Sequence, residues 1–328
     1  MLEFSVKPLL CSKPAAHVVL DLEERKRLSA AVASRGSDAK HFAAEAGFTY
    51  DTLRPWITLA SKNRNPSLSE YLRLCRFLGL DPQPPRLLRF NNSAYDLRLL
   101  PTKVCVDSEV ALALGLFAAE GWKRSLKKVA FTNTSQVVVE FFLNVLLNHF
   151  GARKNELTLY VYAPDARTAR SAVFGSASLS SLAVRAYAYK NSRLPCFILS
   201  WNSCVGRYLF EESLVLLEQN LWREPKLAAA LLSGLLAGDG CVSFSPERHY
   251  YEVSLALAPI EMRLAVKALD LLDISYRVRP FRNVANLLKL NIHRKSNFER
   301  LLNAGGFAFS EEKNIKLREA IAAYTFSR

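Results

Sequence analysis

The sequence predicts a mixed α+β fold in which a small all-α domain precedes a larger body built from two similar halves. Three observations support this prediction. Only helical periodicity is found before the stretch LDPQPPRLLRF at 80–90, whose clustered prolines end any helix. Beyond it, the decapeptide LALGLFAAEG at 112–121 returns as LLSGLLAGDG at 231–240, with five of ten positions identical. Similar helix and strand patterns follow both copies, which indicates an internal repeat.

The predicted domain limits follow from these features. We expect a helical domain at 1–90, a linker at 91–106, a first repeat at 107–224 and a second repeat at 225–328. A chain of 328 residues, half of them hydrophobic, is long enough for two or three domains of roughly 100–200 residues each.

The charge balance favours a polyanionic partner. Lysine and arginine number 44 against 30 acidic residues, which gives a net charge of +14 and indicates nucleic acid first and an anionic membrane surface second. No apolar run approaches the length of a membrane span, and the N-terminus lacks the pattern of a signal peptide, so we expect no membrane partner.

The cysteines and histidines argue against a zinc site and for a reducing compartment. The six cysteines form no C-x-x-C pair, and the five histidines lie far apart without ligand spacing. We therefore expect reduced, mostly buried thiols in an intracellular, cytoplasmic protein associated with the nucleoid.

The N-terminal domain contains four candidate helices, at 22–36, 37–47, 49–61 and 67–80. Small Ala43, Gly47 in a turn and Leu53 in the next helix would let two helices cross closely. Over residues 22–82 the pattern resembles a helix-turn-helix of the phage-repressor type, in which Pro55 is tolerated only in the first turn of the recognition helix. The resemblance implies a helix start that enters the major groove of DNA with Thr49, Tyr50, Thr52 and Arg54. A small helical bundle used for packing or dimer contacts is the alternative.

Each half of the larger body predicts the order α-β-β-α-β-β-α. The first repeated stretch is followed by a strand pattern at 127–135 and a helix pattern at 137–151, the second by the same pair at 250–259 and 260–274. Two such halves would form one pseudo-twofold body, so that a monomer is already complete.

The repeated helices each end in one carboxylate. Gly115 and Ala119 in the first helix, and Gly234 and Gly238 in the second, would let the two backbones approach closely. Glu120 and Asp239 would then meet at two helix C-termini, where the macrodipoles are already negative and the carboxylates repel one another. Divalent cations make such an arrangement favourable, because oxygen ligands hold Mg²⁺ while leaving room for water and phosphate.

These doubled stretches resemble the paired motifs of the single-chain LAGLIDADG homing endonucleases, and the likeness covers residues 107–328. The resemblance implies a saddle of two antiparallel sheets over a long double-stranded DNA site. It also implies hydrolysis of both strands with two or more Mg²⁺ ions. Glu120 and Asp239 would be the metal-binding acids, with the backbone carbonyls of Ala119 and Gly238 as lesser ligands.

The family also uses a lysine or glutamine near the cleavage centre. The corresponding positions fall near Ser135 and Leu257, and neither of these residues is a lysine or a glutamine. Candidates elsewhere, each with a plain surface residue as the alternative, are Gln136, Lys289, Lys295 and Lys313. The arginines expected to grip phosphates are Arg277, Arg279, Arg282 and Arg294. A strand face with Thr132, Thr134 and Gln136 would present polar groups to DNA or simply to solvent.

The leading functional hypothesis is therefore an enzyme, a metal-dependent, site-specific double-strand DNA endonuclease that acts as a monomer. Two alternatives remain open. The same saddle would serve a transcription regulator that binds DNA without cutting it, or a maturase that binds group I intron RNA. Divalent-dependent strand cleavage separates the first from the other two, and a preference for intron RNA separates the third from the second.

Overall fold

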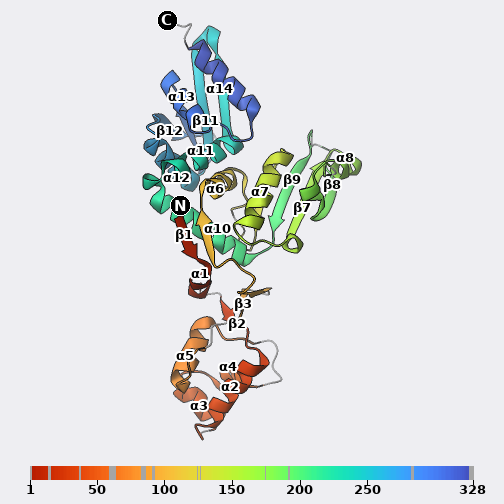
Figure 1. Ribbon diagram of the computed structural model, residues 1–328, viewed down its shortest axis with the longest axis vertical. Coiled ribbons are helices and arrows are strands. Elements are labelled where there is room, and N and C mark those ends of the chain that lie inside the picture. Colours follow the sequence, from red (N-terminus) through yellow and green to blue (C-terminus); the bar gives the residue numbers. More distant parts are fainter. Residues whose placement is uncertain are drawn as a thin grey trace. The chain divides into compact units, whose positions relative to one another are not determined.

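The computed structural model describes most of the chain (Figure 1), namely residues 2–13, 16–36, 38–58, 64–82, 86–90, 93–123, 125, 127–173, 175–190, 193–281 and 284–324. The chain forms two compact units, one of residues 5–103 and one of residues 1–4 and 104–328. Both units contain helices and strands, and several small sheets are present, which confirms the mixed α+β class.

The N-terminal unit is mainly helical but is not all-α, so that part of the prediction is wrong. Its helices are α1 (Val6–Ser12), α2 (Leu22–Ala33), α3 (Ala39–Glu45), α4 (Tyr50–Ile57) and α5 (Leu68–Leu78). A three-stranded sheet accompanies them in the order β2 (His17–Val18), β3 (Leu87–Phe90) and β4 (Ser93–Asp96). Leu88 and Phe90 are fully buried while Leu87 and Arg89 are partly exposed, a period of two that the nearby prolines obscured in the sequence.

The turn between α3 and α4 has the expected geometry. Gly47 has a φ of 73°, a conformation that costs glycine little, and Ala43 and Leu53 are fully buried on either side. Pro55 lies in the second turn of α4 rather than in the first. The helix ends two residues later, and the buried Arg25 guanidinium donates there to the carbonyls of Pro55 and Trp56.

The first half of the C-terminal unit begins with the helix α6 (Ser108–Glu120). It continues with β6 (Val129–Asn133), α7 (Gln136–Asn148), β7 (Leu157–Ala163), α8 (Ala166–Ser171), α9 (Ala177–Ser180), β8 (Ala183–Ala188), β9 (Cys196–Trp201) and α10 (Cys204–Asn220). The strands form a sheet in the order β6-β9-β7-β8, in which β8 runs parallel to β7 and the other pairs are antiparallel.

The second half begins with α11 (Pro225–Asp239). It continues with β10 (Gly240–Ser245), β11 (Tyr250–Leu257), α12 (Pro259–Leu271), β12 (Tyr276–Pro280), β13 (Leu288–Ile292), α13 (Lys295–Asn303) and α14 (Glu311–Ala323). These strands form an antiparallel sheet in the order β10-β11-β13-β12. This half follows the predicted order and adds α14.

The first half departs from the predicted order. Between α6 and β6, the described residues contain an isolated bridge from Gly121 to Phe131 in place of the first expected strand, and β8 is an additional parallel strand. A strand pattern of a few residues is weakly specified by sequence because pairing depends on the neighbouring strand. In the same unit, β1 (Leu2–Ser5) pairs with β5 (Lys103–Val106).

Two further predictions concern the burial of the cysteines and the absence of a membrane-spanning helix. The six cysteines are free, but only Cys75 and Cys204 are buried, so the expectation of mostly buried thiols is wrong. Among the described residues, every helix is too short or too polar to cross a bilayer.

Candidate functional site at the junction of the repeated helices

The two repeated helices, α6 and α11, lie side by side in backbone contact (Figure 1). A Cβ atom on Gly115 would overlap the carbonyl oxygen of Leu231, and one on Gly234 would overlap that of Leu112. Only glycine fits at these two positions, because the facing atoms are backbone and cannot rotate away. The contact therefore sets the relative placement of the two helix ends.

Glu120 is the last residue of α6 and Asp239 is the last residue of α11. The Glu120 side chain lies against the end of α11, since a Cβ atom built on Gly238 would stand 3.1 Å from its Cγ, and its charge acts on Asp239. Glu120 is partly buried and Asp239 is exposed, and neither has a hydrogen bond or an ion pair with another described residue. The structure thus brings the two predicted acids together without a direct hydrogen-bonding or ion-pair partner among the described residues.

The pKa values of both acids are raised, and the charges of two nearby lysines only partly offset the shift. Burial raises the pKa of Glu120, against the opposing charges of Lys313 and Lys123. Burial and the neighbouring charge of Glu120 raise the pKa of Asp239 to about 6, again against the two lysines. The last carbonyls of both helices add partial negative charge at the same place. A cation bound between the acids would remove this repulsion.

Lys313 is the one predicted helper among four that the structure places beside the acids. It extends from α14, and its Nζ donates a hydrogen bond to the carbonyl of Ala237 at 3.1 Å, in the last turn of α11. Burial lowers the pKa of Lys313, while the charges of Cys241, Glu120 and Asp239 act in the opposite direction. The lysine therefore holds the end of α11 and opposes the negative charge there.

The other three candidates are engaged elsewhere. Lys289 on β13 forms an ion pair with Glu252 at 2.7 Å, and Lys295 lies 3.9 Å from Glu299 on α13. Gln136 donates to Glu140 at 3.1 Å. Gln136 is also the first residue of α7, so its predicted place on a strand face is wrong. The strand β6 ends at Asn133, and helix α7 starts three residues later.

Sequence reasoning missed Lys123 and Glu261. Lys123 follows Glu120 by three residues and acts electrostatically on both acids, while its Nζ forms an ion pair with Glu261 on α12 at 2.9 Å. Its carbonyl accepts a hydrogen bond from Arg207 on α10 at 3.3 Å. Its position three residues after Glu120 could have indicated that Lys123 lies near the acids. Its ion-pair partner, Glu261, could not be predicted, because it belongs to the other half of the unit.

The predicted phosphate-binding arginines of the second half lie on one edge of its sheet. Arg277 and Arg279 are exposed on β12, opposite Asn291 and Lys289 of β13. Arg294 is exposed and directly precedes α13. Arg282 lies outside the described residues.

In the first half, Thr132 lies on β6 and accepts a hydrogen bond from Nε1 of Trp122 at 3.0 Å. Thr134 is exposed beyond the end of that strand.

The residues predicted to enter the major groove lie at the start of α4. Thr49 caps this helix by accepting a hydrogen bond from the backbone of Thr52 at 3.2 Å, and the two hydroxyl oxygens are 2.8 Å apart. The guanidinium of Arg54 lies 6.0 Å from the ring centre of Tyr50. The four side chains therefore share one helix start.

The acid pair has the ligand chemistry of a divalent metal site. Two carboxylates meet there, and Ala119 and Gly238 lie in last helical turns, where backbone carbonyls lack intrahelical partners. Oxygen donors of this kind suit Mg²⁺, which retains several waters. Among the described residues there is no cluster of three or more histidine, cysteine, aspartate or glutamate side chains, so two acids would be the protein's whole side-chain contribution of these types.

No family model matches the chain, and no curated protein matches it. Among solved structures, it is similar to the N-terminal LAGLIDADG domain of DUF199/WhiA, at 17% identity over 63% of this chain and 87% of that one, with a TM-score of 0.38. Full-length DUF199/WhiA from Thermatoga maritima is 15% identical, with 68% of this chain and 62% of that chain covered and a TM-score of 0.41.

A third similar structure is I-DmoI in complex with DNA and Mn. It is 13% identical, over 62% of this chain and 98% of that one, with a TM-score of 0.38.

Proposed function

We propose that the protein is a site-specific DNA endonuclease that hydrolyses both strands with divalent metal ions. The observation that carries this proposal is the pair of acids Glu120 and Asp239, which lie at two abutting helix ends and have no ion-pair partners among the described residues. Two carboxylates held together in this position repel each other and lower the stability of the protein. A bound divalent metal ion would remove this repulsion, so a metal-dependent function explains the arrangement.

In this proposal each acid serves one strand. Glu120 and Asp239 would hold the metal ions, two or more in number, with the carbonyls of Ala119 and Gly238 as lesser ligands. Bound Mg²⁺ supplies an activated water and neutralises charge on the leaving oxygen. Lys313 keeps the end of α11 in place through Ala237, and its charge and that of Lys123 attract the scissile phosphates.

The partner in this proposal is a long double-stranded DNA target. The net charge of +14 supports a polyanion, and exposed Arg277, Arg279 and Arg294 supply guanidinium groups for phosphates. The N-terminal unit adds a helix-turn-helix that reads DNA with the start of α4. Because one chain contains both halves, 107–224 and 225–328, a monomer is sufficient.

A non-cleaving DNA-binding regulator is the second candidate. It is favoured by the engagement of Lys289, Lys295 and Gln136 in other interactions, which leaves Lys313 as the single predicted helper beside two acids. In that case the acids would hold a structural cation, or none, and the sheets would bind DNA without hydrolysis.

One experiment separates the candidates. Duplexes that bind the full-length protein are selected from a randomised library in Ca²⁺, and Mg²⁺ is then added to the enriched pool. Double-strand breaks at a fixed position within the bound site support the endonuclease. Specific binding without breaks supports the regulator, and failure to enrich any duplex directs the search to group I intron RNA.

A metal-binding readout independent of cleavage accompanies it. Mg²⁺ is expected to raise the melting temperature of the wild type and to have little effect on Asp239→Asn, because the variant loses one of two carboxylates. Equal shifts for the two proteins would contradict metal binding at the acid pair.

A further inference from the structure

The outer face of the first sheet, which is the face turned away from the core, has a row of side chains that crosses all four strands. Along β7, Leu159 and Val161 are fully buried, whereas Tyr160 and Tyr162 on the opposite face are partly exposed. Strands β9 and β8 lie on either side of β7 (Figure 1). The pairing register continues the row through Thr132 on β6, Ile198 on β9, Tyr160 on β7 and Arg185 on β8. These side chains therefore share one surface.

Four aromatic rings lie on this face. The ring of Tyr187 on β8 is nearly parallel to that of Tyr162, with centres 5.2 Å apart and planes at 17°, and to that of Tyr160, at 6.4 Å and 16°. Trp122 adds a fourth ring beside β6, where its Nε1 donates a hydrogen bond to Thr132 at 3.0 Å. Tyr187 is 41% exposed and Trp122 is 44% exposed. Large ring surfaces on one sheet face thus remain open to solvent.

Stabilisation of an edge strand explains only part of this arrangement. The ring contacts of Tyr187 hold β8 against β7, but the strand order is β6-β9-β7-β8, so Trp122 lies at the other edge of the sheet. There its backbone amide donates to the carbonyl of Ala130 on β6 at 2.9 Å, which fixes the start of the side chain. Open rings at both edges of one face favour a partner with flat rings of its own.

The surroundings of the rings are positively charged. The guanidinium of Arg185 lies 5.8 Å from the ring centre of Tyr160, and Nζ of Lys128 lies 4.5 Å from that of Trp122. None of the strands β6, β7, β8 and β9 contains a carboxylate. Between residues 157 and 203 the one acid is Asp165, which caps α8, against five basic residues, namely Arg167, Arg170, Arg185, Lys190 and Arg193. Rings flanked by cations favour a nucleic acid with accessible base faces.

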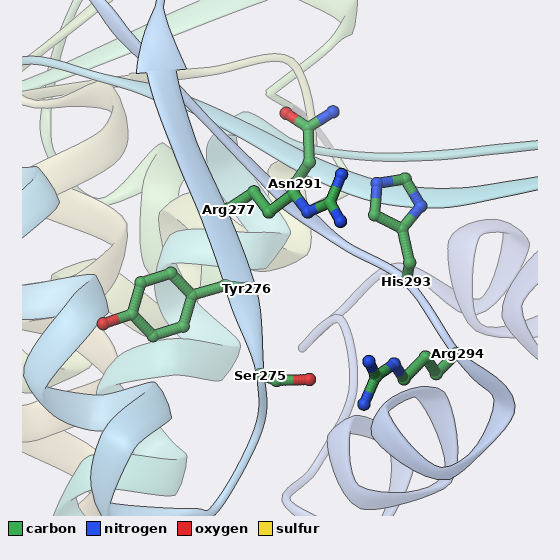
Figure 2. Close-up of a pocket in the computed structure, with 6 residues that line it drawn as sticks. All are labelled: Ser275, Tyr276, Arg277, Asn291, His293 and Arg294. Carbon is green, nitrogen blue, oxygen red and sulfur yellow. The ribbon is translucent and has the colours of Figure 1, made fainter.

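The second sheet has a different chemistry at the corresponding strands. Arg277 and Arg279 lie on the outer face of β12, whereas β7 has two tyrosines. Figure 2 shows Arg277 and Asn291 on the paired strands β12 and β13, and both line a pocket of about 350 Å³ together with Arg294. Polar groups of this kind suit the phosphates of a duplex. Consecutive bases of a duplex are stacked about 3.4 Å apart, so their faces are covered and offer no surface to the rings of the first sheet.

We propose that the outer face of the first sheet binds single-stranded DNA, with unpaired bases stacked on the rings of Trp122 and the three tyrosines. The phosphates between these bases contact Arg185 and Lys128. Stacking on aromatic side chains tolerates any base, because every base has a π face. Binding at this face goes beyond the proposed function, which concerns duplex DNA, and does not depend on it.

The side chain between the two groups of rings favours DNA over RNA. It is apolar Ile198, which lies between Thr132 on β6 and Tyr160 on β7. An apolar side chain suits the methyl group of thymine and provides no hydrogen-bond partner for the 2′-hydroxyl of RNA. The hydroxyl of Thr132 already accepts a hydrogen bond from Trp122. We therefore expect a preference for thymidine-rich single strands.

The first arm of the test measures the affinity of the full-length protein for a labelled oligothymidylate of about 12 nucleotides by fluorescence anisotropy at low ionic strength. Tyr187→Leu and Trp122→Leu are each expected to weaken binding about 10-fold, because each removes one stacking surface. Tyr187→Phe keeps the ring and is expected to bind like the wild type. Trp222→Leu is the matched control for tryptophan, since Trp222 is exposed and lies 4.0 Å from Arg223, but belongs to the short helix η2 (Leu221–Arg223) outside the sheet.

The salt dependence of binding separates stacking from charge. Arg185→Gln is expected to lower the slope of log affinity against log salt by about 0.7, the contribution of one phosphate of a single strand. Tyr187→Leu is expected to lower affinity at every salt concentration without changing the slope. A change of slope in Tyr187→Leu would overturn the stacking assignment. If Tyr187→Leu does not fold, Trp122→Leu provides the same comparison.

The second arm uses a blunt duplex and an oligouridylate of the same length. The two leucine variants are expected to leave duplex affinity unchanged, and an equal loss for duplex and single strand overturns the proposal. Tighter binding of oligouridylate than of oligothymidylate also overturns it and identifies RNA as the partner. If the wild type cuts duplex DNA but does not bind oligothymidylate, the proposed function stands and this face fails. Binding of oligothymidylate without binding or cleavage of any duplex gives the reverse.

Discussion

The two halves of the C-terminal unit share a frame but present different outer surfaces. Three antiparallel strands occur in equivalent order in both, β6-β9-β7 in the first half and β11-β13-β12 in the second. The fourth strand then joins opposite edges, as parallel β8 beside β7 and as antiparallel β10 beside β11. In each half one shared strand contacts the repeated helix, β6 on α6 and β11 on α11, so this part of the core is common to both halves.

The outer face of the first sheet is aromatic. Tyr162 on β7 and Tyr187 on β8 stack with ring centres 5.2 Å apart, and Tyr160 lies 6.4 Å from Tyr187. Cross-strand ring pairs of this kind stabilise the parallel edge strand, which otherwise has few buried side chains.

The outer face of the second sheet is ionic. Burial would raise the pKa of Glu252, but hydrogen bonds from Lys289, Tyr250 and Asn291 outweigh it and leave the pKa below its ordinary value. This charged network lies beside the arginines of β12, whereas the tyrosine face of the first sheet contains one arginine, Arg185, among its described positions. The difference teaches that a duplicated frame can present two chemically distinct surfaces, which suits an asymmetric partner.

The largest expected effect concerns the acids, which are the most symmetric feature of the two halves. Glu120→Gln and Asp239→Asn are each expected to lower cleavage of one DNA strand about 1,000-fold while leaving duplex affinity nearly unchanged, because each removes one metal ligand. Nicking of a supercoiled plasmid that carries the selected site measures this, and the two variants should leave opposite strands intact. Unfolding of either variant would show that the acids are structural.

The next effect tests the shared core. Gly115→Val is expected to lower the free energy of unfolding by about 3 kcal/mol, because the new side chain meets the carbonyl of Leu231 and the helices must separate. Urea denaturation measures the change. Gly175→Ala is the control, since a Cβ there meets nothing within 4 Å. A similarly small loss in both variants would mean that the helix contact is not tight.

A third effect distinguishes the acids by their environment. The folded-state pKa of Asp239 is raised to about 6, so its ionised form destabilises the protein, fully above that pH and progressively less as the pH falls toward about 4. Because Asp239 is exposed to solvent, which screens its charge, Asp239→Asn is expected to be more stable than the wild type by only about 1 kcal/mol at pH 8 without metal and to match it at pH 3. Denaturation at both pH values tests this, and an unchanged difference between them would contradict it.

The smallest effect addresses the ionic face. Lys289→Gln removes the partner of buried Glu252 and is expected to cost about 1 kcal/mol at pH 7. Because the folded-state pKa of Glu252 is lowered, this contribution is present above the unfolded pKa of about 4 and is lost as the pH falls through the folded value. Lys295→Gln is the matched control, and an equal loss of stability in both variants would show that the buried pair contributes nothing.

Local pattern was enough for part of the fold. The repeated helices end at Glu120 and Asp239, at the glycines where their apolar runs stop, and the turn at Gly47 has the conformation that its sequence indicates. Such features depend on a few neighbouring residues. The three-stranded sheet of the N-terminal unit and the parallel strand β8 were not predicted, because strand pairing joins residues far apart in sequence.

By itself, the sequence determined that two helices of this protein end in carboxylates and that glycines allow those helices to touch. Only the tertiary structure decided which charges surround the acids. It selected Lys313 from four candidates, brought Lys123 of the first half to Glu261 of the second, and gathered Arg277 and Arg294 around one pocket. The physical reason is that electrostatic interactions depend on distance through space, and packing rather than sequence spacing sets that distance.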